Sequence, residues 1–163
     1  MLIHMKVDRI IIDPIAKTPI LVLQEIDKDR VLPIWIGQSE AVAIAFALEE
    51  VEPPRPMTHD LTVNLVKLMG WKISRIIITS LKDNTYHAEL VLEKEGKELT
   101  VDSRPSDAVA IALRTDAPVL VEEQVIVDAH RIDMTDAKSV EESKKWKELL
   151  ENLDDEDFGK YKM

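Results

Sequence analysis

The stretches SEAVAIA at residues 39–45 and SDAVAIA at residues 106–112 are nearly identical and decide the fold. They match at six of seven positions, with an offset of 67 residues. At almost the same offset, KVDRIII at residues 6–12 corresponds to KISRIII at residues 72–78. Agreement between two separate pairs of segments indicates an internal duplication.

Each copy begins with strand-like runs that are rich in Ile and Val and separated by turn residues. Six such runs occur, three in each copy, at residues 5–13, 18–26, 30–36, 72–80, 86–93 and 98–101. A helix is expected after each set of three. The pattern therefore predicts two β-β-β-α units, at residues 5–51 and 72–115. Pro33 cannot donate a hydrogen bond within a sheet, so its strand is expected at an edge or at a bulge.

The expected helices, at residues 40–51 and 107–113, are apolar on every face, with Ser39 and Ser106 as their N-caps. A helix that is apolar all round is normally buried on both sides, and its many alanines allow neighbours to approach closely. We therefore predict an α+β domain in which strand layers sandwich the two buried helices. A third helix, at residues 59–69, is expected to be capped by Thr58.

The remaining segments extend this plan towards the C-terminus. Strands are predicted at residues 119–121 and 125–132. From residue 133 the pattern changes to a charged amphipathic helix at residues 140–153, followed by an acidic flexible tail. The interpretation is one domain at residues 1–132 and a C-terminal extension. The apolar helix face around Trp146 and the edge strand with Pro33 both need cover, which predicts a homodimer.

The composition excludes several classes of site. The chain has no cysteine, which excludes disulfides, iron–sulfur clusters and thiol nucleophiles. The formal net charge is −10, which argues against tight binding of nucleic acid, and the few aromatic residues argue against a platform of stacked bases. No apolar run is long enough for a membrane span, and the N-terminus lacks a secretory signal pattern, so a soluble cytoplasmic protein is expected.

His59 and Asp60 form the first candidate site. Histidine is suited to proton transfer near neutral pH, and a neighbouring carboxylate can orient it. The alternative is structural, because Thr58 and Asp60 are residues that a helix beginning favours in any case.

The segment VDSRPSD at residues 101–107 is the second candidate. A helix N-terminus attracts phosphate, Arg104 can bind one, and Asp102 with Asp107 can hold a divalent cation. In the structural alternative, Ser106 caps the helix and Arg104 pairs with Asp102. The comparison of the copies favours function, because the first copy has glycine and glutamine where the second has Arg104 and Pro105.

The turn SLKDNT at residues 80–85 is the third candidate. Lys82 and Asn84 are candidate phosphate contacts, and Asp83 is a further candidate metal ligand. Asp-Asn is also common in turns because both residues tolerate a left-handed backbone, so turn formation alone explains the pattern.

Four motifs together resemble the bifunctional nuclease domain family. They are VLPIWIG at residues 31–37, RPMTHDL at 55–61, SLKDNT at 80–85 and DSRPSDA at 102–108. The resemblance covers roughly residues 5–132. It implies an α+β fold with duplicated units and, through some plant members, a nuclease that acts on both RNA and DNA.

Two hypotheses follow for the function. In the first, the protein is a nuclease with RNA or DNA as a transient substrate: Asp102, with Asp107 or Asp83, binds Mg²⁺ or Mn²⁺, and His59 with Asp60 transfers protons. Arg104 and Lys82 then hold the phosphate. In the second, Arg104, Asp102 and Asn84 form a buried polar network that fixes the interface between the copies, in a non-catalytic oligomeric scaffold or a module that senses a small ligand.

Overall fold

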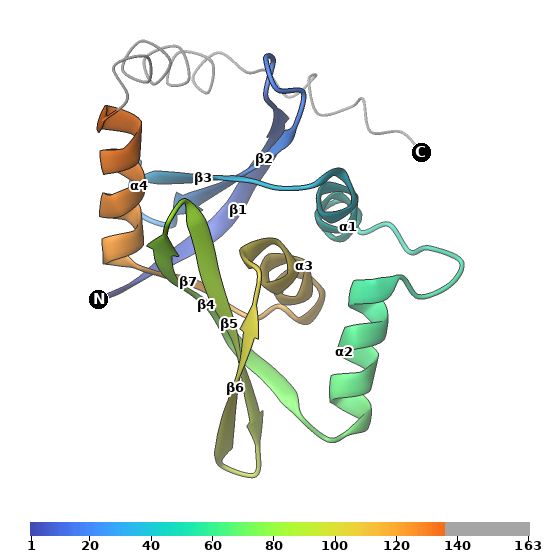
Figure 1. The fold of residues 1–163 in the computed structure, drawn as a ribbon. Coiled ribbons are helices and arrows are strands. Elements are labelled where there is room, and N and C mark those ends of the chain that lie inside the picture. The colour runs from blue at the N-terminus through green and yellow to red at the C-terminus, as the bar shows by residue number, and fades with distance from the viewer. Residues whose placement is uncertain (136–163) are drawn as a thin grey trace.

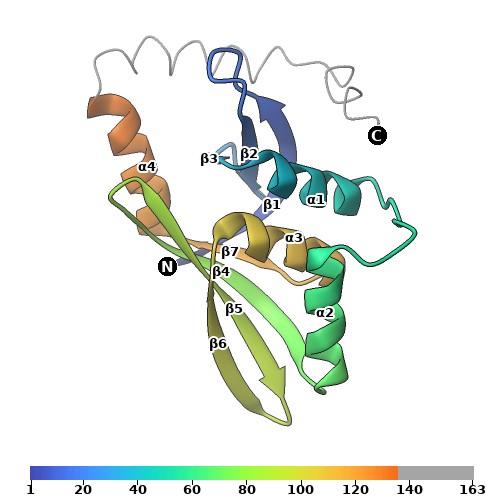
Figure 2. The same ribbon diagram turned by 45° about the vertical axis from the view of Figure 1, so that its right-hand side comes forward.

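The computed structural model describes residues 1–135, so the predicted helix at residues 140–153 and its Trp146 face lie outside the described residues (Figures 1 and 2). Along the chain, the elements are β1 (Leu2–Ile12), β2 (Pro19–Glu25), β3 (Val31–Trp35), α1 (Gln38–Leu48), α2 (Thr58–Leu68), β4 (Lys72–Lys82), β5 (Thr85–Lys94), β6 (Lys97–Ser103), α3 (Pro105–Thr115), β7 (Val119–Glu122) and α4 (Glu123–Thr135).

A single seven-stranded sheet runs through the domain in the order β3-β2-β1-β7-β4-β5-β6. Each copy contributes an antiparallel meander, and β7 joins the two by pairing antiparallel with β1 and parallel with β4. The predicted α+β class is confirmed, but the strands of both copies belong to this one sheet and not to separate layers. Pro33 lies on β3, which is an edge strand as predicted.

The geometry of the two halves is compatible with the predicted duplication. Helices α1 and α3 are each 11 residues long, and their first residues lie 67 positions apart. The first strand of each half also has an irregularity at the same place, between Val7 and Arg9 in β1 and between Ile73 and Arg75 in β4. These positions correspond in the alignment of KVDRIII with KISRIII, so both copies bend their first strand at one point.

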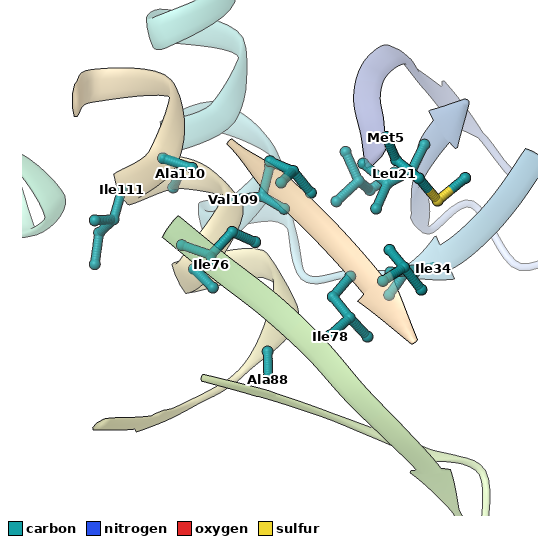
Figure 3. Packing of buried hydrophobic residues seen from close by; sticks show 14 of the residues in the cluster. Met5, Leu21, Ile34, Ile76, Ile78, Ala88, Val109, Ala110 and Ile111 are labelled. Carbon is teal, nitrogen blue, oxygen red and sulfur yellow. The ribbon is translucent and has the colours of Figure 1, made fainter. Parts of the chain in front are cut away.

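One face of the sheet and all four helices share a continuous hydrophobic core. Figure 3 shows part of this core, including Val109 of α3. Alternate strand residues point into it, among them Met5, Leu21 and Ile76, which are almost fully buried. Helix α3 lies at the centre of the helical layer and contacts β4, β5, α1 and α2. Its residues from Ala108 to Ala112 are all buried, which confirms the prediction for this helix.

Helix α1 is less enclosed than the sequence predicted. Ala41, Ala43 and Ile44 are buried, but Leu48 is exposed and the remaining apolar side chains are half-buried. The prediction that both apolar helices are covered on all sides is therefore wrong for α1. The reason is topological: α3 packs against β4, β5, α1 and α2, whereas α1 packs mainly against α3 and β2.

The predicted N-caps were also wrong. The caps of α1 and α3 are Gly37 and Arg104, so Ser39 and Ser106 lie inside the first helical turn. The cap of α2 is Met57, whose backbone N–H donates to the Asp60 carboxylate at 2.9 Å. Ser39 and Ser106 occupy the second helical position and Thr58 the first. In the sequence alone, a serine or threonine so close to a helix start cannot be distinguished from an N-cap.

The segment expected to be a strand at residues 125–132 belongs to helix α4. Its β-branched residues suggested a strand, but Val125, Ile126 and Ala129 are the buried side chains, whereas Val127 is exposed. Buried residues that lie three and four positions apart, as these do, share one face of a helix. Every helix in the described part of the chain is too short or too polar to cross a bilayer. The homodimer and the cytoplasmic location stay predictions.

Replacing Ile76 by alanine is expected to destabilise the domain by about 2–5 kcal/mol, because a fully buried side chain leaves a cavity between β4 and α3. The matched control is Ile15→Ala, at a side chain that is 79% exposed, with an expected effect within about 0.5 kcal/mol. Urea unfolding followed by circular dichroism measures both. Equal losses in the two variants would contradict the assigned core.

Candidate functional site

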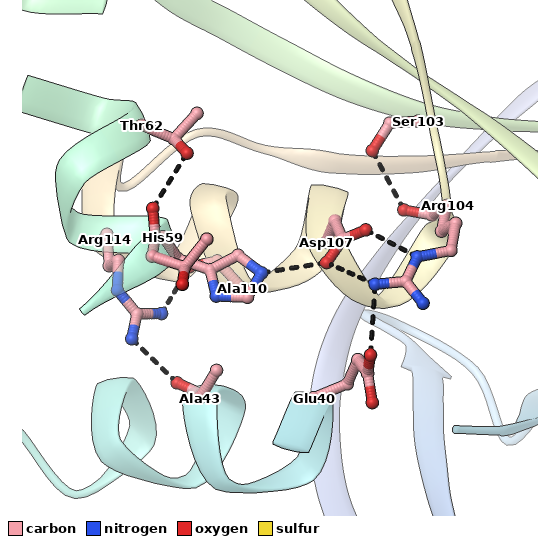
Figure 4. A network of polar contacts seen from close by, with 10 residues as sticks. Glu40, Ala43, His59, Thr62, Ser103, Arg104, Asp107, Ala110 and Arg114 are labelled. Carbon is pink, nitrogen blue, oxygen red and sulfur yellow. Dashed lines mark hydrogen bonds and ion pairs between the residues drawn. The ribbon is translucent and has the colours of Figure 1, made fainter. Parts of the chain in front are cut away.

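The first turns of three helices meet at one polar cluster, shown in Figure 4. They supply Glu40 from α1, His59 from α2 and Asp107 from α3. Nε2 of His59 lies 2.9 Å from Oδ1 of Asp107. Arg104, the residue that caps α3, donates to Asp107 through Nε at 2.7 Å and through Nη2 at 3.1 Å. We call these four residues the helix-end cluster.

Arg104 joins the two copies of the duplicated unit. Its Nη2 lies 3.0 Å from Oε1 of Glu40, the residue that corresponds to Asp107 at the offset of 67. Arg104 itself corresponds to Gly37. An added Cβ at Gly37 would lie 2.1 Å from Oε2 of Glu40, so the Glu40 side chain would have to move from the position in which it meets Arg104. The glycine of one copy thus leaves room for a carboxylate that the arginine of the other copy binds. The cluster is one site made by both copies.

The carboxylate of Asp107 stays ionised over a wide pH range. Burial alone would raise its pKa, but the hydrogen bonds from Arg104 and His59 outweigh burial and hold the pKa below its ordinary value. The same ion pair raises the pKa of Arg104. Asp107 therefore presents a fixed negative charge to His59 and can stabilise a protonated imidazole.

The helix-end cluster keeps unused hydrogen-bonding groups. Within residues 1–135, neither Nδ1 of His59 nor Nη1 of Arg104 has a hydrogen-bond partner, and 64% of the Arg104 side chain is exposed. Arg104 occupies the N-cap position of α3, but among the described residues no side chain accepts a hydrogen bond from the N–H groups of the first turn. These N–H groups therefore add positive potential beside Arg104. The cluster thus combines a proton acceptor on His59 with donors for an anion.

Arg114 lies next to the cluster and connects the helices that carry it. The sequence analysis did not identify this residue. From the last turn of α3, its Nε donates to Asp60 at 2.7 Å and its Nη2 donates to the backbone oxygen of Ala43 at 2.9 Å. One half-buried guanidinium therefore ties α3 to α1 and α2. A basic residue in the last turn of a helix is ordinary, so the sequence carried no signal for this role. Glu40 was also missed, although its correspondence to Asp107 could have shown it.

The predicted residues near the cluster have different partners from those expected. His59 binds Asp107 and not Asp60, because Asp60 uses its two oxygens for Arg114 and for the backbone of Met57. Arg104 pairs with Asp107 and not with Asp102. Asp102 is exposed on β6, opposite Glu89 of β5.

Lys82, Asp83 and Asn84 lie at the tip of the β4–β5 hairpin and outside the helix-end cluster. Asp83 and Asn84 both have left-handed backbones, with φ of 49° and 58°, which agrees with the turn interpretation. Tyr86, next to the tip, donates to the backbone oxygen of Pro33 at 3.3 Å, so the tip lies against β3.

Asp102, Asp107 and Asp83 do not fit a metal site in this structure. They belong to β6, α3 and the hairpin tip, and both oxygens of Asp107 already accept hydrogen bonds. In the part of the chain that the structure describes, no group of three or more His, Asp or Glu side chains is placed to hold a metal ion. The helix-end cluster does bring together His59, Arg104 and Asp107.

Comparison with known proteins places the chain in a family. The family model described as "Bifunctional nuclease domain" matches residues 21–134. An uncharacterized protein of Mycobacterium tuberculosis (strain H37Rv) is 43% identical over 147 residues, which cover 86% of this chain and 88% of the relative.

Plant proteins with an explicit nuclease name are more distant. The protein called Bifunctional nuclease 2 of Oryza sativa subsp. japonica is 32% identical over 110 residues, and Bifunctional nuclease 1 of the same subspecies is 28% identical over 109 residues. Each match covers 65% of this chain but only 34% and 33% of the plant proteins. The chain therefore spans about a third of the plant relatives.

The Asp60–Arg114 pair predicts how stability depends on pH. Burial alone would raise the pKa of Asp60, but the Met57 N–H and the Arg114 guanidinium hold it below the ordinary value of 3.8. Because the pKa of Asp60 is lower in the folded chain than in the unfolded chain, ionised Asp60 stabilises the fold. This stabilisation is complete at pH values above the pKa in the unfolded chain, and it is lost as the pH falls through the pKa in the folded chain. Asp60→Asn should cost about 1–3 kcal/mol at neutral pH and less in acid. Urea unfolding at about pH 7 and about pH 3 measures the difference; a cost that does not shrink in acid would contradict the assignment.

Proposed function

Because the chain belongs to the bifunctional nuclease domain family, we propose that it hydrolyses phosphodiester bonds of RNA or DNA at the helix-end cluster. The observation that carries the proposal is the contact of 2.9 Å between His59 and Asp107, with Arg104 bound to the same carboxylate. A histidine, an orienting carboxylate and an exposed arginine are the groups that acid–base hydrolysis of a phosphate ester requires.

In the proposed mechanism, His59 is the general base. Its Nε2–H donates to Asp107, which leaves Nδ1 to accept a proton from the attacking water. Asp107 holds the ring in this tautomer and stabilises the imidazolium that forms. As the water oxygen bonds to phosphorus, the P–O bond to one sugar oxygen breaks. The leaving oxygen takes a proton from solvent, and the imidazolium releases its proton to solvent, which restores the base. The side chain of His59 is only 14% exposed, so its surroundings hold the ring in place.

Arg104 binds the phosphate group. Its Nη1 offers two donors, and Nη2 can exchange Glu40 for a phosphate oxygen, because an ion pair at an exposed arginine is weak, about 0–1 kcal/mol. The N-terminus of α3 adds backbone donors to the same place. Together these groups stabilise the negative charge that grows on the phosphoryl oxygens.

Water as the nucleophile is compatible with both RNA and DNA, because this step does not need the 2′-hydroxyl that distinguishes them. The net charge of −10 favours release of the product over retention of the polyanion. The proposed mechanism does not place Mg²⁺ or Mn²⁺ on Asp102, Asp107 and Asp83. These residues lie apart, and the Asp107 carboxylate is hydrogen-bonded to Arg104 and His59.

One observation favours a second candidate function, a non-catalytic module. The network that includes Arg104 and Arg114 connects α1, α2 and α3, and such a network can serve only to fix the helices. In that case, substitutions in the helix-end cluster lower the melting temperature and the wild-type protein has no nuclease activity.

Replacing His59 by asparagine is expected to lower the rate of oligonucleotide cleavage about 100-fold or more, because the general base is lost. The matched control is His87→Asn, at an exposed position on β5, which should leave the rate unchanged. A fluorogenic RNA and a fluorogenic DNA substrate measure the rate, and thermal unfolding checks the fold. Full activity in a folded His59→Asn variant would remove His59 from the mechanism.

Asp107 and Asp102 offer a second matched pair. Asp107→Asn removes the charge that orients His59 and holds Arg104, so the cleavage rate should fall about tenfold or more. Asp102→Asn, on the exposed face of β6, should cleave like the wild type. Loss of activity in Asp102→Asn and not in Asp107→Asn would contradict the helix-end cluster and favour a site on β6.

A further inference from the structure

A cavity of about 260 Å³ lies between α2, the beginning of β4 and the end of α3. Its apolar lining comes from Val63 and Val66 of α2, from Trp71 just before β4 and from Ile73 in β4. This volume is just below the range of about 300–1,000 Å³ for pockets that hold a drug-sized molecule. The size therefore favours one small group of a longer ligand.

The rim of the cavity is positive in a protein that is strongly negative overall. Lys67, Lys72 and Arg114 line it, against one acidic residue, Asp116. Arg114 is committed to Asp60, but neither Lys67 nor Lys72 has an ion-pair partner among residues 1–135, and both are exposed. Two unpaired lysines beside an apolar cavity are suited to a ligand that carries negative charge next to a flat apolar group.

Trp71 gives the cavity an aromatic wall. Its ring is half-buried against the core, and Nζ of Lys94 lies 5.9 Å from the ring centroid while donating to the backbone oxygen of Met69 at 3.0 Å. These contacts hold the ring at a fixed place. The few aromatic residues of the chain argue against a platform for successive bases, but one fixed tryptophan is enough to contact a single base.

The cavity is connected to the helix-end cluster through α2 and Arg114. Arg114 lines the cavity and binds Asp60, the neighbour of His59. Lys67 follows His59 by eight residues on the same helix, a rise of about 12 Å at 1.5 Å per residue. A nucleic-acid strand of a few nucleotides is long enough to extend from one place to the other.

We infer that this cavity is a subsite for one unpaired nucleotide of the substrate, with the base against Trp71 and a backbone phosphate on Lys67 and Lys72. The inference rests on the proposed nuclease function and specifies its substrate as single-stranded nucleic acid. A base paired within a duplex cannot enter a cavity of this size, so duplexes must open before they bind here.

The test is binding of a fluorescein-labelled single-stranded oligonucleotide of about ten nucleotides, a usual site size for such proteins. Anisotropy is measured in a His59→Asn background so that the probe stays intact. Lys67→Gln with Lys72→Gln should weaken binding at least fivefold and lower the slope of log Kd against log salt by about 0.7, the value for one phosphate contact on a single strand. Trp71→Leu should weaken binding at least fivefold. The charge-matched control is Lys6→Gln with Lys17→Gln, at exposed positions on β1 and in the turn between β1 and β2, with no effect expected.

The outcomes separate this inference from the proposed function. If the wild type cleaves the oligonucleotide but the lysine variants bind and cleave as it does, the subsite is wrong and the nuclease proposal stands. If binding depends on the two lysines but the wild type does not cleave, the subsite stands and the proposed catalysis is wrong. A protein that neither binds nor cleaves the oligonucleotide overturns both. Equal weakening of binding by Lys6→Gln with Lys17→Gln would show that the effect comes from overall charge, and this result would overturn the subsite.

Discussion

Burial of helix α3 is the constraint on which the other elements depend. Five consecutive residues, from Ala108 to Ala112, are removed from solvent, so every side of the helix must be covered. Strands β4 and β5 cover one side, and α1 and α2 cover the others. Because four of its central side chains are alanine or valine, the neighbours approach closely and their relative positions are narrowly defined. The first turns of α1, α2 and α3 are therefore brought together as a consequence of packing.

This arrangement explains how a duplicated chain makes one asymmetric site. Glu40 and Asp107 occupy corresponding positions in the two copies, and both bind Arg104, which exists only in the second copy. His59 comes from α2, which lies between the copies and belongs to neither. The strands and helices of the scaffold are repeated, but the residues of the proposed mechanism are not. They depend on two differences between the copies: the first has Gly37 where the second has Arg104, and helix α2 is inserted between them.

Most of the fold could be predicted from periodicity and turn residues, including all seven strands of the sheet, the buried α3 and the edge position of Pro33. The failures have physical causes. A helix of β-branched residues, α4, resembles a strand locally, and only the burial of Val125, Ile126 and Ala129 on one side distinguishes it. The partners of His59 and Arg104 lie 48 and 64 residues away in the sequence, at Asp107 and Glu40, and such pairs depend on helix packing that local patterns do not contain.

The central claim is that His59 and Asp107 act as one unit in hydrolysis. A double-mutant cycle on kcat/KM tests it most directly, with His59→Asn, Asp107→Asn and the combined variant compared with the wild type. If the two residues act as one unit, the combined variant loses little more activity than His59→Asn alone, because the carboxylate acts only through the imidazole. Losses that multiply, in variants that unfold at the same temperature, would show that the two residues act independently and would contradict the account.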